Sequence, residues 1–303
     1  MIEHFRQLMA RAAAAVRPYL PKRWRSDLPV VPVVRLTGVI GFSTPLRPGL
    51  SIAGVAKTLD RAFGVRNATA VALVINSPGG SAVQSHLICR RIRALAEEKK
   101  LPVIAFVEDV AASGGYMIAC AADEIVCDPA SIVGSIGVIG ATFGFPEAMK
   151  KLGVERRIYT AGEHKSMLDP FLAENEDDVG RLKSIQRDIH EMFIGLVRER
   201  RGKRLTGPEK TLFSGEYWVG ETAKDFGLVD QIGDVRAFLR ERFGEDVKMP
   251  PIAAERSLLG RWTAGAAGIA SEQRLDRAID RHGLIDDVIS AIETRAIWAR
   301  FGL

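Results

Sequence analysis

The chain has 303 residues, of which 47% are hydrophobic and 26% are charged, a composition typical of a folded globular protein and not of a disordered one. Its formal charge is +5, and residues 1–28, with six basic and two acidic side chains, carry most of the excess. The rest of the chain is nearly neutral. We therefore expect no nucleic-acid partner, because phosphate binding needs a basic face on the folded domain.

Residues 1–20 place apolar side chains at intervals of three and four, with arginines between them, which predicts an amphipathic helix. We define residues 1–28 as a basic N-terminal arm. Two placements stay open for it: residues 1–25 lie on an anionic membrane surface with Trp24 at the interface, or they dock on the body or on another subunit. Its apolar positions are interrupted by Arg6, Arg11 and Arg17, so neither a secretory signal peptide nor a transmembrane helix is expected.

From Val30 onward, short apolar runs alternate with helical patterns. Strands are predicted at 30–41, 70–76, 102–108, 124–129 and 156–160, and helices at 51–63, 81–99, 114–122, 145–152 and 177–200. This alternation predicts an α/β fold with a largely parallel sheet, in one domain spanning residues 29–250. Residues 251–303 are predicted to form a C-terminal helical arm with balanced charges.

Ser113 lies at a corner of this pattern. An apolar run stops at Ala111-Ala112, Ser113 follows, and two glycines precede the next apolar run. A strand that turns sharply into a helix presents a side chain at the helix N-terminus, where free N–H groups stabilise an oxyanion. Ser113 is therefore the candidate nucleophile. The alternative is an ordinary turn in which Ser113 caps the helix.

Two other glycine-rich segments accompany that corner. The first, Asn76-Ser77-Pro78-Gly79-Gly80, follows a predicted strand, so it and the Ser113 turn are each expected to supply an N–H to one oxyanion. The second, residues 132–140, suits a bend against which a substrate backbone lies. Neither matches the phosphate-binding patterns GxGxxG or GK[ST], so no nucleotide is expected.

The serine needs a base, and two neighbouring residues are candidates. His164 and Lys165 lie in a polar turn ahead of the predicted helix at 177–200. A lysine acts as a base only when neutral, which near neutral pH requires lowering its pKa by about three units, or about 4 kcal/mol. Composition and spacing do not choose between them. The three cysteines, Cys89, Cys120 and Cys127, lack CxxC spacing and lie in or beside apolar runs, so buried thiols and no metal site are expected.

Five motifs together resemble the signal peptide peptidase A family of serine-lysine proteases. They are INSPGG (75–80), ASGGY (112–116), VGSIGV (133–138), GEHKSMLDPF (162–171) and FSGEYWVGETAKDFGLVDQIG (213–233), and the resemblance spans residues 30–245. It implies that Ser113 is the nucleophile and Lys165 the general base. It also implies an oxyanion hole from the N–H groups of Gly80 and Gly114, and a substrate groove formed by Gly79, Val133, Gly134, Ser135 and Ile136.

The same resemblance implies a crotonase-like, Clp-type superhelix of βαβ units and a serine endopeptidase that cleaves apolar or signal-derived peptides without a cofactor. The motif set occurs once, as in half-length members that assemble into homo-oligomeric rings, with active sites that neighbouring subunits share. Those proteases usually begin with a transmembrane anchor, which the basic amphipathic arm replaces here. The chain is therefore expected in the cytoplasm or at the inner membrane surface of a bacterium.

Two other functions compete with the protease. A crotonase-type acyl-CoA enzyme also uses two glycine-loop N–H groups, and it needs a glutamate near the second loop, where Glu108 is the candidate. A ring-forming membrane scaffold, anchored through residues 1–25 and with a silent site, needs no chemistry. A crotonase has no use for the pair Ser113 and Lys165, and a scaffold has no reason to retain it.

Overall fold

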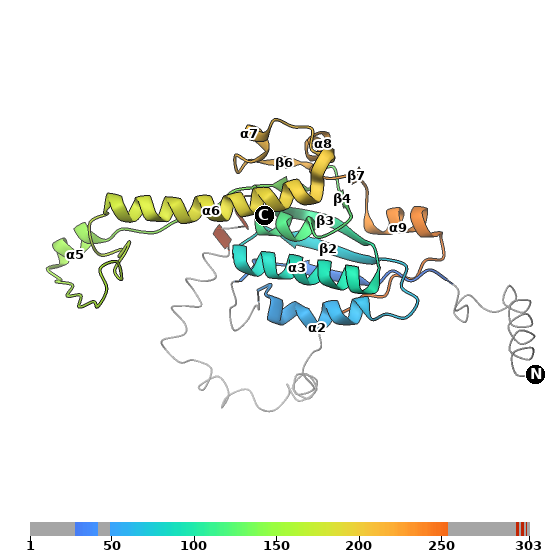
Figure 1. Ribbon diagram of the computed structural model, residues 1–303, viewed down its shortest axis with the longest axis horizontal. Coiled ribbons are helices and arrows are strands. Elements are labelled where there is room, and N and C mark those ends of the chain that lie inside the picture. The colour runs from blue at the N-terminus through green and yellow to red at the C-terminus, as the bar shows by residue number, and fades with distance from the viewer. Residues whose placement is uncertain (1–27, 42–48, 254–294, 297, 300, 302–303) are drawn as a thin grey trace, which may run out of the picture.

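The computed structural model describes residues 28–41, 49–253, 295–296, 298–299 and 301 (Figure 1). The predicted N-terminal arm and most of the C-terminal arm lie outside the described residues. Within the described part, no helix combines the length and the apolar character needed to cross a membrane.

A parallel sheet forms the centre of the molecule. Its strands run in the order β1-β2-β3-β4-β7, all parallel, and β5 and β6 extend it beside the end of β3. The bounds are β1 Val33–Thr37, β2 Val71–Ser77, β3 Val103–Ala112, β4 Glu124–Cys127, β5 Ile132–Gly134, β6 Tyr217–Val219 and β7 Gln231–Ile232.

Helices cover both faces of this sheet. Successive side chains of a strand point to opposite faces, so Leu73 and Ile75 of β2 join one core cluster while Ala72 and Val74 join the other. The first cluster is covered by α2 (Ile52–Phe63), α3 (Ala82–Lys99) and α4 (Gly114–Ala119), and the second by α9 (Val235–Phe243). Burial of both faces explains why these strands are apolar runs without alternation.

The fold-class prediction is confirmed: parallel strands joined by helices form successive βαβ units, as expected for a crotonase-like α/β fold. Four of the five predicted strands and all five predicted helices are present. The strand predicted at 156–160 is wrong. Those residues form an exposed irregular segment in which Arg156 pairs with Asp169, and no strand among the described residues lies beside them to accept their hydrogen bonds.

An arm projects from the body on one side (Figure 1). We use "the arm" for residues 140–175, which include α5 (Pro146–Leu152), together with the N-terminal half of α6 (Glu176–Arg201). The sequence predicts that α6 packs along its whole apolar stripe. Instead, its buried residues are confined to the C-terminal part, from Phe193 onward, and Ile185 is 48% exposed.

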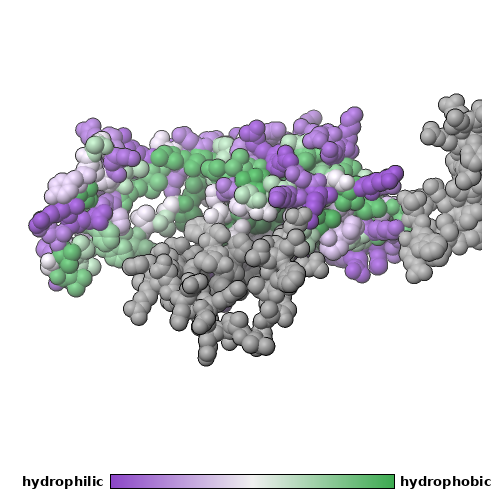
Figure 2. All heavy atoms as spheres, turned by 90° about the horizontal axis from the view of Figure 1, so that it is seen from below, coloured by the Kyte–Doolittle hydropathy of each residue, from purple (hydrophilic) through white to green (hydrophobic). Residues whose placement is uncertain are grey.

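The arm also exposes apolar side chains (Figure 2), including Phe143, Leu152, Val154 and Tyr159, of which Tyr159 is 90% exposed.

The three cysteines are buried, as predicted. Burial raises the pKa of the Cys89 thiol to about 11, and those of Cys120 and Cys127 to about 12. Such thiols are protonated and unreactive at neutral pH.

A buried ion pair fixes the end of α6 to the sheet. Arg201, 2% exposed, donates from Nη1 and Nη2 to the Asp230 carboxylate at 2.8 and 3.0 Å, and from Nε to the Gly227 carbonyl at 2.9 Å. Asp230 also accepts the N–H of Ile125, the second residue of β4. Burial alone would raise the pKa of Asp230, but hydrogen bonds and charge from Arg201 outweigh it and hold the pKa below the usual range. The short η3 (Gly202–Arg204), α7 (Glu209–Leu212) and α8 (Gly220–Asp225) complete this region.

Replacing Arg201 with methionine should lower the free energy of unfolding by about 3 kcal/mol, the low end for a broken buried pair, because the half-buried Asp230 then keeps only the 3.4 Å contact with Arg204 and the Ile125 N–H. Arg198→Met, which breaks the exposed pair with Glu209, should cost less than about 1 kcal/mol. Denaturant titrations of the two variants check this difference. Equal losses would contradict it.

The same pair predicts a pH dependence. The pKa of Asp230 is lower in the folded state than in the unfolded state. The contribution of Asp230 to the free energy of unfolding is therefore complete above the unfolded pKa of about 3.9 and is lost as pH falls through the folded pKa. An Asp230→Asn variant should therefore lose less stability than the wild type below about pH 4.

Candidate active site

The turn between β3 and α4 presents the Ser113 side chain. Ser113 follows the last residue of β3 and occupies the N-cap position of α4, with φ 52° and ψ −120°. A non-glycine residue in this region is strained by about 1–3 kcal/mol and persists only where its surroundings hold it. Its side chain makes no capping hydrogen bond. The ordinary capping role, the alternative drawn from the sequence, is therefore not the role that Ser113 has here.

The backbone of this turn is held by β5. Residues Val110–Ala112 of β3 pair with β5 in parallel register, and the Ser113 N–H donates to the Gly134 carbonyl at 2.8 Å. The Gly114 N–H belongs to the first turn of α4, where the helix supplies no acceptor. That N–H is therefore available beside Ser113.

The loop after β2 approaches the same turn. The Gly79 carbonyl accepts the Ile40 N–H, and the Ser81 N–H donates to the Ile40 carbonyl, each at 2.8 Å. Because successive N–H groups of an extended chain point to opposite sides, the Gly80 N–H points away from Ile40. We find no acceptor for it among the described residues.

Two glycines make this approach sterically feasible. A Cβ added to Gly79 would lie 2.8 Å from the Cβ of Ser113, and one added to Gly80 would lie 2.1 Å from the Ile40 carbonyl oxygen. Both residues also have positive φ values, 102° and 139°. The absence of a Cβ at these two positions thus allows the loop after β2 to lie directly against the Ser113 turn.

A cavity of about 700 Å³ opens over this turn. Four of the residues predicted from the sequence line this cavity together: Gly80, Ser113, Gly114 and Ser135. Gly79 does not line it but lies against Ser113. Val133 and Ile136, predicted in the substrate groove, are fully buried in the core, while Val138 and Ile139 line the cavity. Strand β5 ends at Gly134, and the positive φ values of Gly134 and Ser135 interrupt the alternation of side chains, so Val133 and Ile136 both face the core while Ser135 lines the cavity.

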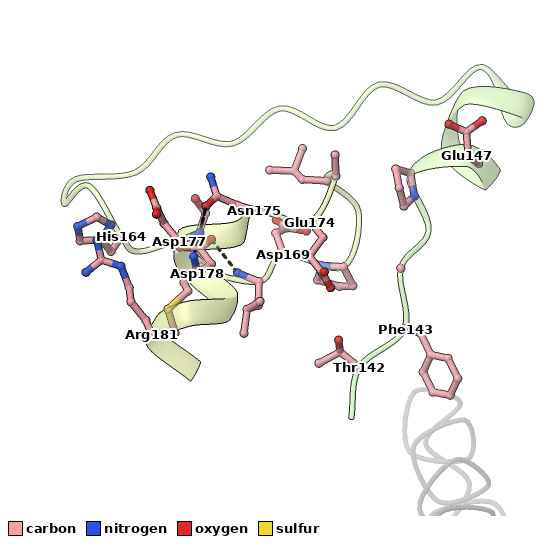
Figure 3. Close-up of a pocket in the computed structure, with 18 of the residues that line it drawn as sticks. Thr142, Phe143, Glu147, His164, Asp169, Glu174, Asn175, Asp177, Asp178 and Arg181 are labelled. Carbon is pink, nitrogen blue, oxygen red and sulfur yellow. Dashed lines mark hydrogen bonds between the residues drawn. The ribbon is translucent and has the colours of Figure 1, made fainter. Parts of the chain in front are cut away.

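Lys165 lies elsewhere, in the arm. Its neighbours Glu163, His164 and Ser166 line a second cavity of about 680 Å³ together with residues of the α6 N-terminal region: Glu174, Asn175, Asp177, Asp178 and Arg181 (Figure 3). Lys165 itself is exposed. Along α6, the Ser113 cavity reaches Ile189 and the arm cavity reaches Arg181, positions about 12 Å apart at the helical rise per residue. Lys165 is not among the residues that line the Ser113 cavity of its own chain.

Two residues that the sequence did not single out lie in the Ser113 cavity. His190 of α6 lines it, and its Nε2 lies 3.0 Å from the Ile136 carbonyl oxygen. Phe301 lines it from the C-terminal region, packed on Val110 and Ala112, with its ring edge-on to Tyr217 at 5.1 Å between centroids. The sequence pointed to His190 only through the helical period of residues 177–200, which places it near Ile189 and Phe193. It gave no indication of Phe301.

Among residues 28–41 and 49–253, no group of three or more His, Cys, Asp or Glu side chains is arranged to hold a metal ion.

Glu108, the glutamate that an acyl-CoA enzyme would need, lines a different cavity. Both of its carboxylate oxygens accept hydrogen bonds from Arg35 Nη1 at 2.8 Å.

A family match and two of the relatives are those of proteases. Residues 95–245 match peptidase family S49. "Probable protease SohB" of Buchnera aphidicola is 32% identical over 206 residues, which is 68% of this chain and 60% of that protein. "Serine protease SPPA, chloroplastic" of Arabidopsis thaliana is 35% identical over 161 residues, 52% of this chain and 23% of that protein.

A further relative carries a different name. "Na(+)/H(+) antiporter NhaA" of Brucella abortus is 53% identical over 285 residues, which is 94% of this chain but 38% of that protein. The chain thus spans less than two thirds of the length of each of these three relatives. Most of the protein called an antiporter has no counterpart in this chain.

Replacing Gly80 with alanine tests the close approach of the two loops. The added Cβ would meet the Ile40 carbonyl oxygen, and the positive φ would strain it further, so a loss of about 2–4 kcal/mol in unfolding free energy is expected. Gly195→Ala in α6, where nothing lies within 4 Å of the new Cβ, is the matched control and should be neutral or slightly stabilising. Similar midpoints for both variants in a urea titration would refute the packing described here.

Proposed function

Since the chain carries a peptidase family S49 domain, we propose that it is a serine endopeptidase in which Ser113 is the nucleophile and Lys165 the general base. The observation that carries this proposal is the Ser113 turn: a strained serine without a capping bond, flanked by the N–H groups of Gly80 and Gly114 and opening into a cavity. Such an arrangement suits nucleophilic attack on a carbonyl.

The proposed reaction has two steps. Neutral Lys165 takes the proton from Ser113 Oγ as Oγ bonds to the peptide carbonyl carbon, and the Gly80 and Gly114 N–H groups donate to the oxyanion, each contributing about 3–4 kcal/mol. The protonated lysine then gives its proton to the leaving amine, and an acyl-enzyme remains. Water hydrolyses the acyl-enzyme with the lysine again acting as base, which regenerates Ser113.

The lysine is proposed to come from a neighbouring subunit. Two observations support this: Lys165 lies on the projecting arm away from its own Ser113, and it is exposed, whereas a lysine base needs burial to be neutral. The apolar side chains exposed on the arm supply a surface that a second copy would cover. Repetition of this head-to-tail contact closes a ring in which every site is shared.

Apolar peptides are the proposed substrates. The cavity beside Ser113 is lined on several sides by apolar groups, among them Met117, Val138, Ile139, Phe193 and Phe301. Such a lining favours apolar side chains next to the cleaved bond. Signal-peptide remnants and other membrane-derived peptides have this chemistry, and contact of residues 1–25 with a membrane surface would bring the enzyme near them.

Other activities have less support. An acyl-CoA enzyme would use Glu108, which is bound to Arg35 and faces another cavity. The antiporter name belongs to a relative of which this chain matches 38%, and the peptidase-family match lies within this chain. His164, on the arm, and His190, in the Ser113 cavity, remain the alternative bases.

Mixing two inactive variants tests the shared site. Ser113→Ala and Lys165→Ala should each lower the hydrolysis of a fluorogenic apolar peptide by about 10³-fold or more while keeping the wild-type assembly. Dissociated, mixed and reassembled, they should regain about a quarter of wild-type activity, since one interface in four then pairs an intact serine with an intact lysine.

The controls separate the alternatives. Each variant taken alone through the same dissociation must stay inactive. If mixed assemblies form and no activity returns, serine and lysine belong to one subunit. If Lys165→Ala keeps full activity, the lysine is not the base, and the two histidines are tested next.

A further inference from the structure

Besides the pairing of Gly134 with Tyr217 of β6, three hydrogen bonds in the described part of the chain hold the backbone of residues 134–136, and each involves a different element. The Ser113 N–H donates to the Gly134 carbonyl at 2.8 Å, and the Ser135 N–H donates to the Glu216 carbonyl at 2.6 Å. The third joins His190 Nε2 on α6 to the Ile136 carbonyl oxygen at 3.0 Å. Only this third bond is made by a side chain.

The chemistry of the third bond fixes its direction. A carbonyl oxygen can only accept, so the proton lies on His190 Nε2, and His190 is the donor. That nitrogen cannot serve at the same time as an acceptor for the Ser113 hydroxyl proton. The other ring nitrogen, Nδ1, has no role in this contact.

The segment needs such a restraint because its backbone is strained. Gly134 and Ser135 have consecutive positive φ values, 113° and 52°, and an L-residue such as Ser135 adopts this conformation only where its surroundings enforce it. Ile136 follows the strained pair directly. Its own side chain is fully buried in the core, and its carbonyl is held by the hydrogen bond from His190.

We propose that His190 is a positioning residue for the reaction described above: it holds the 134–136 segment, and through the Gly134 carbonyl it holds the Ser113 turn. The inference rests on the proposed function for its effect on catalysis. His190, Ser113 and Ser135 line the same cavity, so the segment that His190 restrains is also the wall against which a substrate lies.

Two substitutions separate this role from that of a base. His190→Gln places an amide Nε2 at the same number of bonds from the backbone and keeps the donor, whereas His190→Leu removes it. We expect His190→Leu to lower kcat about tenfold or more with a smaller change in KM, because a misplaced nucleophile weakens the transition state more than binding. His190→Gln should stay within about threefold of wild type. Glu191→Gln, an exposed neighbour on α6, is the matched control.

Hydrogen exchange gives a readout that does not need activity. In the assembled protein, peptides covering residues 109–117 and 130–140 should exchange faster in His190→Leu and at the wild-type rate in His190→Gln and Glu191→Gln. Wild-type kcat and exchange in His190→Leu would overturn the proposal. So would a His190→Gln variant as inactive as His190→Leu, which would make the ring a base.

If the wild-type protein cleaves no peptide, the proposed function fails, and exchange alone decides this inference. Faster exchange confined to His190→Leu upholds the positioning role. Equal exchange in all four proteins overturns it.

Discussion

The site depends on how closely two loops approach each other. The loop after β2 lies so close to the turn after β3 that a Cβ added to Gly79 would collide with the Cβ of Ser113. The parallel sheet makes this contact, because β2 and β3 are neighbours and their carboxyl ends meet at one edge. Ser113 is held in a strained conformation there by β5, whose Gly134 carbonyl accepts its N–H. The conformation of Ser113 and its contact with the loop after β2 therefore follow from the packing of three strand ends.

In the proposed function, the body of one chain supplies the nucleophile and the oxyanion site, and its arm carries the base. This division has a physical consequence. A lysine base needs burial to be neutral, and Lys165 is exposed in the described chain. Under the proposed function, assembly both brings the lysine to the serine and removes the water around it. Activity then depends on protein concentration, and an isolated subunit is inactive without any inhibitor.

Much of the fold could be predicted from the sequence because the signals are local. Apolar runs ended by Asn76 and Ala112 mark the strands, and the Ser-Gly-Gly corner marks the turn. What the sequence did not show depends on partners in space. The run at 156–160 has strand-like residues but no neighbouring strand among the described residues, and the apolar stripe of α6 is only partly covered in its N-terminal half, where Ile185 is exposed. Val133 and Ile136 face the core and His190 faces the cavity, and such facing is set by packing, which no motif records.

One cross-linking experiment tests the shared site directly. The three native cysteines are buried, so a Ser113→Cys/Lys165→Cys variant offers two accessible thiols for a short bis-maleimide. Within a chain no bridge is expected, because Lys165 lies on the arm and does not line the Ser113 cavity. We expect a ladder of covalently joined chains on a denaturing gel, absent for either single variant. An assembled protein that yields only single chains, with both thiols labelled, would contradict it.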